Sequence, residues 1–159
     1  ELEQIRQANL ASFRRLLPFA EKNGVIIAIE NMARYGEGLS FGADAGQLIE
    51  LVDELGSPNV GICLDTSHAN IVKMDIPAAV RRMGHRLAAT HLSDNLGAHD
   101  DHLFPYSGRI QWPPIVEALR EIGYARLFNL ETPGENRCPP EFVRLKLRHA
   151  RQLLALLLS

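Results

Sequence analysis

The sequence is poor in cysteine, has no surplus of positive charge and contains no long apolar run. Its two cysteines, Cys63 and Cys138, cannot form a disulfide framework across 159 residues, so we expect a protein of a reducing compartment, the cytoplasm. Lysine and arginine number 17 against 19 aspartate and glutamate residues, which gives a formal net charge of -2. Without a cationic surplus to neutralise phosphates, a dedicated nucleic-acid-binding protein is not expected.

Segments for export or membrane insertion are also missing. The first residues, ELEQIRQANL, are polar and charged, and the apolar C-terminal LLALLLS is far shorter than the ~20 residues that cross a bilayer. Hydrophobic residues make up 46% and charged residues 23% of the chain, as in an ordinary globular protein. We therefore expect a soluble, unexported protein without a membrane partner, folded as one domain over residues 1–159.

Short apolar runs alternate with amphipathic helical segments along the chain. The runs are typical of strands buried on both faces of a sheet, because they show no alternation of polar and apolar residues. The predicted strands are 25–29, 60–64, 87–90 and 127–130, with a Gly-rich loop at 35–42. The predicted helices are 2–21, 45–55 (between Asp44 and Gly56), about 76–83, about 113–122 and about 140–158. This alternation implies a parallel sheet with right-handed crossovers.

Only four strands can be identified, and a helix precedes the first of them. An open doubly wound sheet and a barrel both place function at the carboxyl ends of parallel strands, but a closed barrel needs eight strands and about 250 residues. We predict an α/β fold of the (β/α)8 TIM-barrel type, of which this chain supplies about the last four βα units, beginning in the helix before the fifth strand. Such a partial barrel has two unpaired edges, so we expect either a missing N-terminal barrel half or a homo-oligomer to cover them.

Each predicted strand ends at a side chain that can bind a metal ion, namely Glu30, Asp65, His91 and Glu131. Because parallel strands place their carboxyl ends at one face, these four side chains are expected to converge. A single polar residue often ends a strand for structural reasons, but four such residues favour a shared site. Three carboxylates and one imidazole suit Mn2+, Mg2+ or Co2+, and Zn2+ is also compatible.

A second group of polar residues follows the strand ends. His68 lies three residues after Asp65, and the loop after the third predicted strand contains Asp100, Asp101 and His102. These side chains can contact a substrate, bind a second metal or orient the first ligands. Trp112 can wall the same pocket, although a single aromatic residue is more often part of the core. The candidate substrate-binding residues are His68, Asp101, His102 and Trp112, and the candidate ligands of an additional metal are His68, Asp100 and His102.

Several motifs combine these residues in a recognisable order. They are Ile-Glu30-Asn-Met, Gly-Ile-Cys-Leu-Asp65-Thr-Ser-His68, Thr-His91-Leu-Ser-Asp-Asn, Asp101-His102-Leu with Gly108-Arg-Ile-Gln-Trp112, and Asn-Leu-Glu131. As a set they resemble the xylose isomerase-like TIM barrel superfamily, which includes sugar-phosphate isomerases and epimerases, inosose dehydratases and endonuclease IV. The resemblance covers nearly the whole chain and corresponds to the C-terminal portion of a family barrel. It implies that Glu30, Asp65, His91 and Glu131 are metal ligands, and that His68 is a substrate contact in the sugar enzymes or a zinc ligand in the nuclease.

The expected function is that of a metal-dependent isomerase or epimerase acting on a small sugar, sugar phosphate or polyol. A divalent ion would polarise a carbonyl group and stabilise an enediolate, while Glu30 and Glu131 exchange a proton at carbon as base and acid. Gly97 stands where ketose 3-epimerases of this family carry an arginine, which argues against a 3-epimerase in particular.

Two alternatives remain open. The first is a zinc phosphodiesterase that resembles endonuclease IV and holds an additional zinc between His68, Asp100 and His102, although the net charge of -2 argues against a DNA substrate. The second is an inactive truncated barrel that dimerises through its apolar terminal helices, above all through residues 153–158.

Overall fold

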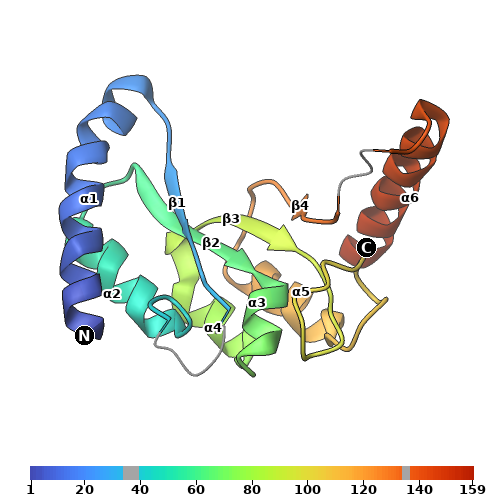
Figure 1. Cartoon of the computed structure of the whole chain (residues 1–159), viewed down its shortest axis with the longest axis horizontal. Helices are drawn as coiled ribbons and strands as arrows, with labels where there is room; N and C mark the ends of the chain where they lie inside the picture. The colour runs from blue at the N-terminus through green and yellow to red at the C-terminus, as the bar shows by residue number, and fades with distance from the viewer. Residues whose placement is uncertain (34–39, 134–136) are drawn as a thin grey trace.

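The fold was determined as a computed structural model, which describes residues 1–33, 40–133 and 137–159 (Figure 1). Helices and strands alternate along the chain, as the sequence predicts. The elements are α1 (Leu2–Asn23), β1 (Ile27–Glu30), α2 (Ala45–Leu55), β2 (Val60–Asp65), α3 (Thr66–Ile71), α4 (Ile76–Met83), the 3-10 turn η1 (Gly84–Arg86), β3 (Leu87–Leu92), α5 (Trp112–Glu121), β4 (Asn129–Leu130) and α6 (Pro140–Leu158). Residues 34–39 of the predicted Gly-rich loop lie outside the described residues.

The strands form one parallel four-stranded sheet in the order β1-β2-β3-β4. The register pairs Glu30 with Cys63 and Asp65 with His91, so the carboxyl ends of neighbouring strands lie side by side. Strands β1 and β4 form the two edges of this sheet, and α1 and α6 lie at opposite sides of the molecule (Figure 1). The α/β class is therefore confirmed, and the parallel order agrees with consecutive units of a barrel.

Helix ends follow signals that are visible in the sequence. The side chain of Asp44 accepts a hydrogen bond from Gly46 N at the start of α2, and Gly56 ends that helix in the left-handed conformation. Asp75 caps α4 in the same way by accepting from Ala78 N at 3.0 Å. These caps explain why the predicted bounds of α2 and α4 agree with the structure.

Two elements differ from the prediction. Helix α3 was not expected, because six residues are too few to show an apolar stripe. Strand β4 has only two residues, whereas a strand was predicted at 127–130. The carbonyl oxygen of Leu127 accepts hydrogen bonds from the side chains of Tyr124 and Thr90, at 2.9 and 3.3 Å, in place of a strand partner.

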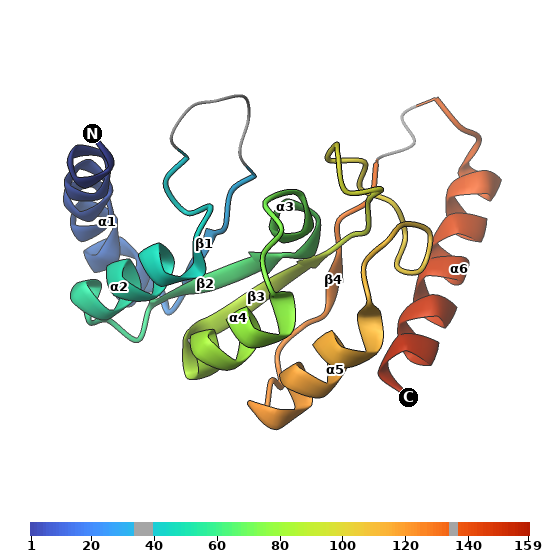
Figure 2. The ribbon, with the colours of Figure 1, turned by 90° about the horizontal axis from the view of Figure 1, so that it is seen from below.

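The hydrophobic core lies on one side of the sheet. Helices α2, α4 and α5 run side by side along this face (Figure 2), and Val60, Ile62 and Leu64 of β2 pack into the apolar cluster that the helices complete. Because side chains alternate along a strand, Cys63 and Asp65 point to the other face. The strand-end residues that the sequence predicts as metal ligands are therefore on the face opposite the core.

The contact between β2 and β3 is unusually close at Gly61. A Cβ atom at this residue would lie 2.5 Å from the Cβ of Ala88 and 2.8 Å from the carbonyl oxygen of Arg86. Only glycine allows this approach, which lies next to a register shift between Ile62 and Cys63. Within the described ranges, no helix is both long enough and apolar enough to span a membrane.

Candidate metal centre

The four strand-end side chains meet at the carboxyl edge of the sheet. Glu30 and Asp65 are the last residues of β1 and β2, His91 lies near the end of β3, and Glu131 directly follows β4. One ligand atom of each residue lies within 4.8 Å of the ligand atoms of the other three. A backbone hydrogen bond of 3.2 Å from Glu131 N to Leu92 O holds Glu131 in this position beyond the short strand.

The distances around His91 match a group of ligands that share one centre. Its Nδ1 atom lies 3.0 Å from Glu30 Oε1 and 2.9 Å from Glu131 Oε2. The contact with Glu131 lacks hydrogen-bond geometry, and Oε2 has no hydrogen-bond partner within the described part of the chain. One ring nitrogen therefore faces two carboxylate oxygens, of which it satisfies only one.

Asp65 is the most deeply buried member of this group. Its carboxylate is fully buried, and Oδ1 accepts a hydrogen bond from His68 N at 2.7 Å. Oδ2 has no hydrogen-bond partner among the described residues. Burial, the neighbouring Glu131 carboxyl, with which it can share a proton, and the charge of Glu30 raise the pKa of Asp65 to about 6, against the lowering effect of the His68 N–H and imidazole. A divalent cation fits this arrangement, because it would satisfy the orphaned oxygen and oppose the repulsion between the carboxylates.

Asn31 fixes the position of this ligand, although the sequence analysis gave it no role. The side chain is fully buried, and its Oδ1 accepts from Asp65 N at 2.7 Å while its Nδ2 donates to Asp65 O at 3.0 Å. The backbone carbonyl of Asn31 also accepts from the Nδ1 atom of His68 at 2.8 Å. The sequence feature that could have indicated a role for Asn31 is its place directly after Glu30, at the end of a predicted strand.

A second cluster consists of His68, Asp100 and His102, whose ligand atoms also lie within 4.8 Å of one another. The Nε2 atoms of His68 and His102 lie 3.1 and 2.9 Å from the same oxygen, Asp100 Oδ2. The Nδ1 atoms face backbone carbonyls, that of His68 at Asn31 and that of His102 at Glu131, 3.3 Å away. An Nδ1–H donated to each carbonyl leaves both Nε2 lone pairs directed at Asp100, which is the arrangement of a histidine ready to bind a metal.

The protonation of these histidines reflects their acidic surroundings. Burial disfavours the imidazolium of His68, but the charges of Asp65, Asp100 and Glu30 and the carbonyl of Asn31 outweigh it and raise the pKa. For His102, burial is likewise outweighed, mainly by Asp100 and the Glu131 carbonyl, so its pKa is also raised. Each cluster therefore attracts positive charge, whether as a proton or as a metal ion.

The other two candidate residues support the loop that carries Asp100 and His102. Trp112 is buried, with 1% of its surface exposed, and its Nε1 donates to Asp94 Oδ2 at 2.9 Å. Asp101 Oδ2 accepts from Leu96 N at 3.1 Å. The structure does not place either side chain in the two clusters, and their contact with a substrate stays a prediction.

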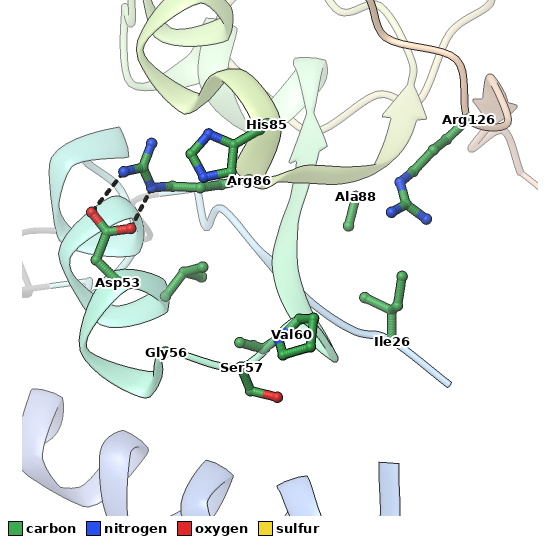
Figure 3. Close-up of a pocket in the computed structure, with 11 residues that line it drawn as sticks. Ile26, Asp53, Gly56, Ser57, Val60, His85, Arg86, Ala88 and Arg126 are labelled. Atoms are coloured by element: carbon green, nitrogen blue, oxygen red, sulfur yellow. Dashed lines mark hydrogen bonds and ion pairs between the residues drawn. The ribbon is translucent and has the colours of Figure 1, made fainter. Parts of the chain in front are cut away.

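A separate pocket lies at the opposite end of the strands (Figure 3). Its walls include Val60 at the start of β2, together with Ile26, Ala88 and Arg126. Arg86 in this pocket forms an ion pair with Asp53, with 2.9 Å between Nη2 and Oδ2. The lining contains no member of the two clusters of candidate ligands, which lie at the carboxyl edge of the sheet.

Comparisons with known proteins find relatives of similar sequence and a solved structure of similar fold. A D-psicose 3-epimerase of Enterocloster bolteae is 35% identical over 119 residues, which are 75% of this chain and 37% of that protein. The inosose isomerase of Bacillus subtilis is 26% identical over 156 residues, 94% of this chain and 53% of that protein. A solved structure, the IOLI protein with a bound zinc atom, superposes with a TM-score of 0.81 at 23% identity and covers 100% of this chain and 58% of its own.

The chain thus spans between about a third and somewhat more than half of the length of these relatives. The family model of the xylose isomerase-like TIM barrel matches residues 1–153. Since this match includes nearly every residue, the chain belongs to the xylose isomerase-like TIM barrel family.

Proposed function

We propose that this chain carries the metal centre of a divalent-metal-dependent isomerase or epimerase of a small sugar, sugar phosphate or polyol. The observation that carries this proposal is the convergence of Glu30, Asp65, His91 and Glu131 around the unpartnered Oδ2 of Asp65. The names of the relatives, a D-psicose 3-epimerase and an inosose isomerase, support a sugar or polyol substrate.

The ligand chemistry narrows the choice of metal. Three carboxylates and one imidazole favour Mn2+, Mg2+ or Co2+, and the zinc-bound relative keeps Zn2+ in consideration. A divalent cation bound here would act as a Lewis acid toward a substrate carbonyl.

The exposure of the carboxylates suggests how they divide the work. The side chains of Glu30 and Glu131 are 31% and 42% exposed, whereas that of Asp65 is 0% exposed. Asp65 is therefore the fixed ligand, which no substrate can touch. Glu30 and Glu131 lie on either side of His91, and we assign them the base and acid roles in proton exchange at a substrate carbon.

The second cluster favours a second candidate function. His68, Asp100 and His102 could hold an additional zinc, as expected for a phosphodiesterase resembling endonuclease IV. The same residues serve the sugar isomerase if they hydrogen-bond substrate hydroxyl groups. The net charge of -2 favours the small substrate over nucleic acid.

Strands β1 and β4 leave the sheet open at both edges among the described residues. We propose that further parallel strands pair there, supplied by an N-terminal barrel half or by a second copy of the chain. An inactive barrel that dimerises would have the same edges, so solution mass must be measured together with metal content.

The deciding experiment combines metal analysis with a chemical test for proton exchange. We expect at least one divalent cation per chain and, with a suitable ketose or cyclic polyhydroxy ketone in deuterated water, deuterium incorporation at the carbon next to the carbonyl group. Asp65→Asn should lose the cation, while Asp75→Asn, which changes a helix cap away from the site, should keep it. A chain that binds no cation even when excess metal is added would exclude the proposed function.

A further inference from the structure

The loop between β3 and α5, residues 93–111, carries two members of the second cluster, Asp100 and His102. It contains no helix and no strand, and only one isolated bridge crosses it. The position of its side chains must therefore come from specific contacts. Five hydrogen bonds converge on Asp94, which is fully buried.

The carboxylate of Asp94 joins the beginning of the loop to its end. Oδ1 accepts hydrogen bonds from Asn95 N at 2.8 Å and Ile110 N at 3.0 Å. Oδ2 accepts from Trp112 Nε1 at 2.9 Å. All three neighbours are N–H donors, so both side-chain atoms of residue 94 must accept hydrogen bonds. Aspartate has two accepting oxygens, whereas asparagine has only one.

The backbone of Asp94 fixes the residue next to His102. Asp94 N donates to Leu103 O and Leu103 N donates to Asp94 O, both at 2.8 Å. His102 itself has a φ of 48°, a left-handed conformation that histidine adopts only where its surroundings impose it. The bridge between Asp94 and Leu103 thus holds His102 in a left-handed conformation, which an unconstrained loop would not keep.

Gly108 shows how closely the loop packs on Asp94. A Cβ atom at Gly108 would lie 2.2 Å from Asp94 Oδ1 and 2.4 Å from the carbonyl oxygen of Asn95. Any larger residue would therefore push the carboxylate from its place.

We propose that Asp94 is a positioning residue, whose buried carboxylate clamps both ends of the loop and thereby holds Asp100 and His102 against His68. The use of these three residues, as ligands or as substrate contacts, rests on the proposed function. The clamp itself rests only on the contacts of Asp94.

The test compares Asp94→Asn with Asp75→Asn in the whole chain. Both aspartates accept a backbone N–H, but Asp75 caps α4 outside the loop. Long-range 1H–15N spectra, recorded with a chelator at alkaline pH where imidazoles are neutral, report the tautomer of His102. We expect the Nδ1–H form in the wild type and in Asp75→Asn, and exchange between both tautomers in Asp94→Asn, because Nδ1 no longer stays at the Glu131 carbonyl.

Zinc titration calorimetry gives a second measurement. Asp94→Asn should weaken binding at the second cluster by about 10–100-fold and leave the first unchanged. If Asp94→Asn does not fold, Gly108→Ala provides a second test, because its added methyl group displaces the Asp94 carboxylate and the neighbouring Asn95 carbonyl without removing either. Unchanged His102 spectra in these variants would overturn the inference. A wild type that binds no zinc would overturn the proposed function instead, and the spectra would still decide the role of Asp94.

Discussion

Asn31 and Asp65 are joined by two reciprocal hydrogen bonds, in which the amide side chain of Asn31 pairs with the backbone N–H and C=O of Asp65 at 2.7 and 3.0 Å. The pair joins the end of β1 to the end of β2, one residue beyond the regular ladder. It keeps Glu30 and Asp65, two of the proposed metal ligands, at a fixed separation.

Asn31→Ala should therefore damage both stability and metal binding. Loss of the buried partners of Asp65 is expected to lower the free energy of unfolding by about 1–3 kcal/mol and the cation affinity by about 10–100-fold. Urea unfolding and titration calorimetry would measure the two effects. The matched control is Asn59→Ala. It also removes a hydrogen bond that a side-chain amide donates to a backbone carbonyl, Val25 O, but far from the candidate metal centre. Equal loss of cation affinity in both variants would contradict the assignment.

Glu30→Gln and Glu131→Gln test the two proton-exchange roles. Each amide keeps the size of the side chain but cannot take up or release the proton, so turnover should fall by about 10²–10⁴-fold. Deuterium incorporation into the substrate measures this step directly. Glu117→Gln, on the exposed surface of α5, serves as the control. Turnover at the wild-type rate in either site variant would remove that residue from the mechanism.

Removal of the cation should destabilise the chain. A ligand that binds only the folded state, at a concentration 100 times its Kd, stabilises by about 2.7 kcal/mol. For a chain of this length, each kcal/mol shifts Tm by about 2–4 °C. Differential scanning calorimetry with a chelator should show this drop, and added Mn2+ or Co2+ should restore it. No such shift is expected in Asp65→Asn.

The metal-free chain should lose stability as pH rises from about 4 to about 6. Burial is the main cause that raises the pKa of Asp65 from an ordinary 3.8 to about 6, so the folded state favours the protonated carboxyl. The stabilisation is fully present below the pKa of the unfolded state and is lost as pH rises through the pKa of the folded state. Its size is on the order of 3 kcal/mol. Urea midpoints measured with a chelator across this range would reveal it. Asp65→Asn, neutral at every pH, should lack this component, and an identical slope in the variant would assign it to other groups.

Cys63 should resist alkylation until the chain unfolds. Cys63 is 3% exposed, and burial, together with the nearby carboxylates of Glu30, Asp65 and Glu131, raises the pKa of its thiol to about 12. Iodoacetamide requires the thiolate, so mass spectrometry of the digested protein should find Cys63 modified only after denaturant is added. Labelling at a rate typical of an exposed thiol would show that the face of the sheet opposite the core, to which Cys63 points, opens in solution.

The convergence of the four strand-end side chains could be predicted because it depends on simple rules, whereas their role as metal ligands stays a prediction. An apolar run, a turn signal and a parallel connection determine where a strand ends, and His91 needed no more than this to be placed beside Asp65. Cap residues such as Asp44 and Asp75 set helix bounds through contacts within three residues, which a sequence shows directly.

The remaining parts depend on contacts that leave no periodic signal. Asn31 reaches Asp65 across 34 positions, and Asp94 reaches Trp112 across 18. Trp112 was predicted as either a pocket wall or a core residue, and the structure shows it buried with its N–H donated to Asp94; its contact with a substrate stays a prediction. Positioning contacts of this kind depend on which way a side chain points from its loop, and the sequence pattern does not show this orientation.

The carboxylate of Asp65 ends one structural element and begins another. Oδ1 caps helix α3 by accepting from His68 N, while Oδ2 has no hydrogen-bond partner among the described residues and is free to bind the proposed cation. A glutamate is one methylene longer and could not keep both contacts, and an asparagine would keep the helix start at the expense of a ligand. For the proposed cation, metal preference can therefore be altered at Glu30, His91 and Glu131, whereas Asp65 offers no conservative replacement.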